Sequence, residues 1–155
     1  MFETVAVLIV FFFLLGIGLT FYAQSQRGEL AKLKASQFEL TAVQTASRAM
    51  AMPELDCSYA SVRTPNCFDK RKLTAFGQLT RDLDTLLAYA GVFGQANISV
   101  REVYPGTAAW LLFSNLPPPN QTGSSELVQL PIALLDPEGE VRAFGILEVR
   151  VFGTI

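Results

Sequence analysis

The sequence begins with a long stretch that contains almost only apolar residues. Residues 4–23 form a run of 20 positions without a charged side chain. At a rise of about 1.5 Å per residue, a helix of that length spans about 30 Å, the thickness of the hydrocarbon core of a bilayer. The pattern therefore predicts one membrane-crossing helix near the N-terminus.

The helical pattern continues past this run. No proline occurs between residues 24 and 52, and Pro53 then ends the segment, because proline disfavours helix at the residue before it. We therefore expect one helix of which residues 1–24 lie in lipid and residues 25–52 pack on a head domain formed by residues 53–155. The residues that recur at spacings of three and four, and so share one helical face, are Ala31, Ala35, Phe38, Ala42, Ala46 and Ala49.

The head is predicted to begin with a loop and a second helix. Residues 53–67 are rich in polar and turn-forming residues, and Asn66 or Asp69 is suited to cap the helix that follows. Apolar residues at helical spacing predict that helix over residues 69–93. Gly91 and Gly94 supply its stop.

After the second helix the apolar period changes to 2, which indicates strands. Four segments carry it, over about residues 98–104, 108–113, 128–134 and 141–151. Pro131 cannot donate to a ladder, which favours an edge strand or a bulge there. Short turns, including the one expected at residues 136–139, favour an antiparallel meander. The predicted fold class is α+β, with a long N-terminal helix, a second helix and a roughly four-stranded antiparallel sheet.

The connection over residues 114–126 contains three prolines and a polar run. Such a segment has too little apolar surface to order itself. It is either a mobile connection between strands or a variable contact surface, and the sequence does not identify a partner for it.

Charge and composition exclude several classes of function. The chain has 12 Lys and Arg against 14 Asp and Glu, a formal net charge of −2, and no histidine. An acidic balance gives no electrostatic support for nucleic-acid binding. The sequence also lacks a nucleophile elbow, a glycine-rich phosphate loop and clustered carboxylates, so we expect no enzyme, no metal site and no cofactor.

Two cysteines and two sequons bear on the compartment of the head. Cys57 and Cys67 enclose nine residues, and a disulfide between them is the first hypothesis, with two free buried thiols as the alternative. A disulfide would place the head outside the cytosol. Asn97 and Asn120 each begin an N-glycosylation sequon, which points the same way.

The basic residues near the apolar run point to the opposite topology. Arg27, Lys32 and Lys34 follow the run and no Lys or Arg precedes it, which by the positive-inside rule keeps the head in the cytoplasm. We give the cysteines and sequons more weight and expect a single-pass protein with an extracytoplasmic head. A cleaved signal peptide is the alternative for the run itself, but the run is too long and lacks a basic start.

Glu3 is the charge nearest to the apolar run. A carboxylate there either lies at the interface, where the helix macrodipole favours it, or serves a function, since a charge within lipid is costly.

Residues 2–10 (FETVAVLIV) place this acid a few positions from the start and follow it with an unbroken apolar run. With the long helix and the sheet-bearing head, this resembles the type IV pilin superfamily, including pseudopilins and archaeal pilin-like proteins. The resemblance implies that Glu3 pairs with the amino group of a neighbouring subunit and sets the register of a filament. Precursors in that family carry a short basic leader and have the acid fifth after cleavage. Here the acid is third and no leader precedes it, so we expect either a different start or an unprocessed subunit.

The resemblance implies a membrane-anchored, pilin-like structural subunit of a surface filament or of a related secretion or uptake apparatus. Its partners would be the lipid bilayer and copies of itself or related subunits. The alternative is a membrane-tethered, extracytoplasmic binding or sensory domain that never polymerises. The sequence does not distinguish a major from a minor subunit.

Overall fold

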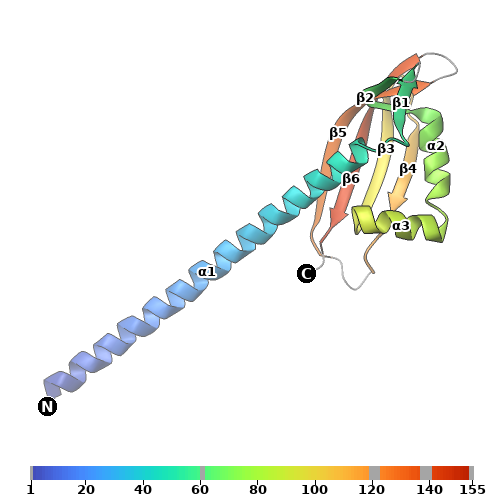
Figure 1. The fold of residues 1–155 in the computed structure, drawn as a ribbon. Coiled ribbons are helices and arrows are strands. Elements are labelled where there is room, and N and C mark those ends of the chain that lie inside the picture. The colour runs from blue at the N-terminus through green and yellow to red at the C-terminus, as the bar shows by residue number, and fades with distance from the viewer. Residues whose placement is uncertain (1, 60–61, 119–122, 137–140, 154–155) are drawn as a thin grey trace. The chain divides into compact units, whose positions relative to one another are not determined.

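The structure is a computed structural model that describes residues 2–59, 62–118, 123–136 and 141–153. The chain divides into two compact units, Met1–Gln37 and Phe38–Ile155. The first unit is helical, and the second combines the end of the same helix with two further helices and a sheet. The fold class is α+β, as the sequence predicts: an N-terminal apolar helix is followed by a curled, mixed sheet of six strands (Figure 1).

Helix α1 spans Phe2–Met50 and has 49 residues. The absence of proline up to Pro53 explains why it continues so far past the apolar run. Within the second unit, Ala42, Ala46 and Ala49 of α1 are buried in the core. Their spacing of four and three places them on one side of the helix, and their small side chains let the helix backbone lie close to the sheet.

The sheet contains more strands than the sequence predicted. The order of its strands is β1-β2-β5-β6-β3-β4, in which β2 and β5 are parallel and all other neighbours are antiparallel. The predicted four-stranded antiparallel sheet corresponds to the last four strands, so it was incomplete. The strands are β1 (Asp56–Tyr59), β2 (Val62–Asp69), β3 (Ala96–Tyr104), β4 (Ala109–Ser114), β5 (Ser125–Asp136) and β6 (Val141–Phe152).

The segment predicted as a loop, residues 53–67, holds β1 and most of β2. Its sequence gives little alternation of apolar and polar residues, and Pro65 argues against a strand. The pairing that completes it is distant in sequence, because Cys67, Phe68 and Asp69 align with residues 133–135 of β5. A local pattern does not contain that information.

The single helix predicted over residues 69–93 is two helices, α2 (Lys70–Leu79) and α3 (Leu83–Phe93). Of the two residues predicted to cap the helix, Asn66 and Asp69, it is Asp69 that caps α2. Its carboxylate accepts a hydrogen bond from the backbone N–H of Arg71 at 2.8 Å. Asp82 caps α3 through the N–H of Thr85. The apolar stripe runs through the break between the helices, so periodicity alone does not reveal it.

The helices pack on one face of the sheet, which we call the inner face, and leave the other, the outer face, uncovered by them. Gly94 ends α3 with a φ of +67°, a conformation that favours glycine, and the chain then enters β3. Along β3 and β6 the residues alternate between the two faces. The inner-face residues in the core include Ile98, Val100, Leu112, Phe113, Ile132, Leu134, Leu147, Val149 and Val151.

Helix α2 lies along the unpaired edge of β4, the last strand of the sheet, as Figure 1 shows. The Thr80 hydroxyl donates to the carbonyl of Leu112 at 2.6 Å, and the indole N–H of Trp110 donates to the Thr74 hydroxyl at 3.0 Å. Gly77 lies so close that a Cβ there would be 2.6 Å from the carbonyl oxygen of Leu111. These contacts occupy an edge that would otherwise be open to pairing with another strand.

We predict that Gly77→Ala destabilises the protein by about 2 kcal/mol, because the added methyl group forces α2 away from β4. Gly91→Ala is the matched control, since Gly91 is also helical and a Cβ there meets no atom within 4 Å. It should stabilise the protein by about 0.5–1 kcal/mol through helix propensity. Thermal unfolding followed by circular dichroism in detergent micelles measures both, and equal effects of the two substitutions would contradict the close packing at Gly77.

Candidate assembly surface

The first part of α1 exposes more apolar surface than the chain can bury. Val5–Gln26 has a mean hydropathy of 2.6 and is long and apolar enough to cross a membrane. Large side chains along it, including Phe13 and Phe21, are exposed. Transferring one such side chain out of water is favourable by about 2 kcal/mol, so this stretch requires lipid or other apolar helices around it.

Glu3 lies in the first turn of α1, and its side chain is outside the described part of the structure. The first four N–H groups of any helix have no partner within the helix, and the dipole there favours a negative charge. The role predicted for Glu3 stays a prediction.

The part of α1 in the second unit has two apolar faces. The buried face carries Ala42 and Ala46, whereas Leu40, on the far side of the helix, is 59% exposed and Val43, on the flank between them, is 48% exposed. A helix on the surface of a soluble domain normally carries polar residues on the side away from the core. We call Leu40 and Val43 the free face of α1.

The end of α1 is fixed to α3. The Arg48 guanidinium donates to the carbonyl of Val92 at 3.0 Å. That carbonyl belongs to the last turn of α3, where carbonyl groups lack partners within the helix and a cation is favoured. The contact therefore joins the last turn of α3 to the end of α1.

Cys57 and Cys67 form the predicted disulfide, with a Cα–Cα distance of 5.3 Å. Both are buried, and the bond joins β1 to β2. The alternative of two free thiols is therefore wrong. A covalent link at this point also fixes the strand that pairs in parallel with β5, and so helps to hold the two strands that the sequence did not predict.

The two sequons lie in different settings. Asn97 is a half-buried residue of β3, between Ser114 of β4 and Arg150 of β6. Asn120 lies outside the described residues. Glycosylation at either position stays a prediction.

A buried ion pair, which the sequence did not reveal, joins α2 to β3. The Lys70 ammonium lies 2.8 Å from the Glu102 carboxylate, with the two side chains 20% and 4% exposed. Gly106 lies over this pair, and a Cβ there would come within 2.9 Å of the carboxyl carbon of Glu102. The two residues are 32 positions apart in sequence, and neither belongs to a recognisable motif.

A hollow of about 300 Å³ lies between α2 and α3 and is lined mostly by apolar atoms, with Glu54, Lys72, Phe76 and Tyr89 among its residues. Burial raises the pKa of the Tyr89 phenol, and the negative charge of Glu54 raises it further. Within the described ranges, no three His, Cys, Asp or Glu side chains gather in a group that could hold a metal ion.

No protein-family model matches the chain, and comparisons with curated proteins and with solved structures find no significant similarity. What the arrangement can do therefore follows from its own residues. The unburied apolar surface of α1 is the feature that most clearly requires a partner.

We predict that Lys70→Met destabilises the protein by about 2–3 kcal/mol, because it leaves the Glu102 carboxylate buried without a counter-ion. Arg101→Met is the matched control. Arg101 pairs with Glu148 at 3.0 Å on the outer face, where both side chains are more exposed, and its loss should cost less than about 1 kcal/mol. Urea unfolding of both variants in detergent micelles tests this, and a Lys70→Met effect no larger than that of Arg101→Met would disprove it.

Proposed function

We propose that the protein is a membrane-anchored, pilin-like structural subunit that assembles through α1 into a surface filament or a related secretion or uptake apparatus. The proposal rests on the free face of α1. Leu40 is exposed on the side opposite the alanines that pack on the sheet, and Val43 is exposed on the flank of the helix beside it. Helices bundled side by side would bury these two side chains, whereas in a monomer outside lipid they stay in contact with water.

The membrane stretch supports the same proposal. Inside lipid the apolar side chains of Val5–Gln26 are satisfied, so the subunit is stable as a single-pass protein before assembly. In a filament the same side chains would pack against those of neighbouring copies. The chain can therefore move from lipid into a helical bundle without exposing this surface to water.

Glu3 is assigned the role of setting register in the assembly. A carboxylate that enters an apolar bundle is costly unless a cation lies beside it, and the amino group of a neighbouring chain would offset this cost. Only one axial offset between two helices brings these groups together, which gives an otherwise smooth apolar contact a preferred register.

The head is proposed to lie outside the cytoplasm. The Cys57–Cys67 disulfide supports this location, because disulfides persist in oxidising compartments and are rare in the cytosol. The basic residues that follow the membrane stretch, including Lys32 and Lys34, argue for the reverse, and the disulfide has more weight because it is part of the folded core.

We predict that Glu3→Ala leaves the protein folded in the membrane and reduces assembled filaments at least about tenfold, because the register contact is lost. Glu39→Ala, which removes an exposed acid further along the same helix, should assemble normally. Surface fibres sheared from cells and analysed by mass spectrometry give the readout. If the chain is never found in fibres and occurs only as a detergent-soluble monomer, the non-polymerising tethered domain is the better description.

The free face of α1 is tested separately by the double substitution Leu40→Gln and Val43→Gln. Both side chains are about half exposed or more, so the head should keep its melting temperature within about 2 °C. Assembly should fall strongly, because the bundle would have to bury two amide groups without partners. Unchanged fibre yield from this variant would show that the free face lies outside the assembled contact.

A further inference from the structure

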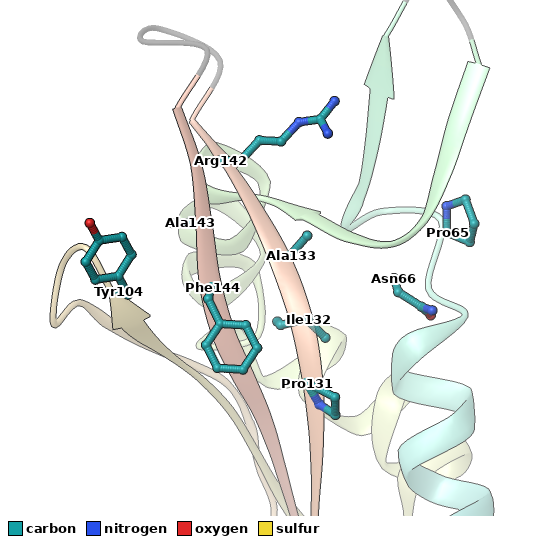
Figure 2. A pocket seen from close by; sticks show the side chains of 9 residues that line it. All are labelled: Pro65, Asn66, Tyr104, Pro131, Ile132, Ala133, Arg142, Ala143 and Phe144. Atoms are coloured by element: carbon teal, nitrogen blue, oxygen red, sulfur yellow. The ribbon is translucent and has the colours of Figure 1, made fainter.

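The outer face of the sheet carries a shallow groove of about 510 Å³. Figure 2 shows Phe144 and Pro131 along its floor, Tyr104 on one side and Asn66 with Pro65 on the other. Arg142 extends above the floor. We call this the outer-face groove. It is too shallow to enclose a small molecule, and its mostly apolar lining fits a chain segment laid across it.

A β-bulge places Tyr104 in the groove. Val100 and Glu102 of β3 are buried on the inner face, so regular alternation would also place Tyr104 there. The register shifts between Glu102 and Tyr104, and Tyr104 aligns with Phe144, an outer-face residue. The two aromatic side chains are 72% and 46% exposed. Bulges commonly redirect a side chain in this way at binding sites.

Three side chains supply polar groups around the groove. Arg142 carries five N–H donors and no acceptor, whereas the Asn66 amide and the Tyr104 hydroxyl can each donate and accept. Among the residues that the structure describes, none of these three side chains has a hydrogen bond or an ion pair. The one charged side chain, Arg142, can only donate, and all three side chains can donate to the backbone carbonyl groups of a bound segment. A proline-rich segment offers such carbonyl groups, and aromatic-lined grooves are the usual site for one.

The chain itself presents such a segment. Asn115 is followed by Leu116, Pro117 and Pro118, of which Leu116 and Pro118 are exposed. We call residues 115–118 the proline segment. Prolines lack N–H groups and are already restricted in φ, so binding them in an extended form costs little conformational entropy.

The proline segment cannot reach the groove of its own chain. Its first residue is held at the start of β3, because the Asn115 N–H donates to the carbonyl of Ala96 at 2.9 Å. The chain is back at the same end of the sheet at Ser124, whose carbonyl accepts the Gly153 N–H. Residues 116–123 can extend outwards and back by at most about 14 Å. Tyr104 lies eight residues further along β3, about 26 Å away. Figure 1 shows these two ends of the sheet well apart.

We propose that the outer-face groove binds the proline segment of a second copy of this chain. The inference names the partner surface within the proposed assembly and so rests on that function. Because the segment and the groove lie at opposite ends of the head, the contact is head-to-tail. Repeated contacts of this kind build an open polymer unless the rotation between copies closes a ring.

A peptide with the sequence of residues 114–120, SNLPPPN, is the probe, and the target is the full chain dispersed as a monomer in detergent micelles. Fluorescence anisotropy of the labelled peptide should show saturable binding. Tyr104→Ala or Phe144→Ala should weaken it by about tenfold, as expected for aromatic residues at the centre of a contact. Leu127→Ala, another exposed outer-face residue that does not line the groove, should leave it unchanged. The peptide SNLAAAN should not bind.

A second measurement uses assembled material. Cells that express Pro118→Cys and Pro131→Cys variants together should give a cross-linked dimer under mild oxidation, whereas neither variant alone should do so.

The absence of saturable peptide binding, or binding that is unaffected by both aromatic substitutions, would overturn the inference. The peptide assay uses dispersed monomers, so its failure leaves the filament proposal standing if Glu3→Ala still blocks fibres. Peptide binding without fibres would instead support the groove as a contact between tethered copies.

Discussion

The structure depends on one constraint, which is that the chain has more apolar surface than it can bury by itself. The second unit, Phe38–Ile155, forms a complete core from the end of α1, the two shorter helices and the sheet, with buried polar atoms satisfied among the described residues. The apolar side chains of Val5–Gln26 have no place in that core. Lipid can accept them, and so can the same stretch of other copies, and the free face of α1 extends this requirement beyond the length that a bilayer covers.

The arrangement of α1 reverses the usual distribution of side-chain size. On the side that contacts the sheet it carries Ala42 and Ala46, on the far side it carries Leu40, and Val43 lies on the flank between them. Small residues let the helix lie close to the sheet, but they contribute little buried area, so the core is filled mainly by residues of the strands such as Phe113 and Leu147. The larger residues of this part of α1 thus stay outside the core.

The sequence predicted those features whose cause is local. The apolar run, the Asp69 cap and the end of α3 at Gly94 follow from residues within a few positions. The disulfide could be predicted because the chain has only two cysteines, Cys57 and Cys67, and they are separated by a short segment. The features it did not predict depend on partners distant in sequence: β2 becomes a strand by pairing with β5, and Glu102 is buried because Lys70 lies beside it. The bulge at Tyr104 left no mark in the alternation, because it moves one residue at the end of a strand.

Two kinds of contact would have different tasks in an assembly of this chain. Packing between apolar helices is strong but tolerates sliding, since one aliphatic side chain replaces another at almost equal energy. A proline segment in an aromatic groove is weak but specific, because it fixes one point on each of two heads. When one helix slides along another by one residue, the two chains move by about 1.5 Å relative to each other. A segment bound in a groove of a few side chains would lose its contacts after a few such steps. In the proposed assembly, a register set at the helix by Glu3 and a register set between heads would have to agree, and this requirement would limit the assembly to few geometries.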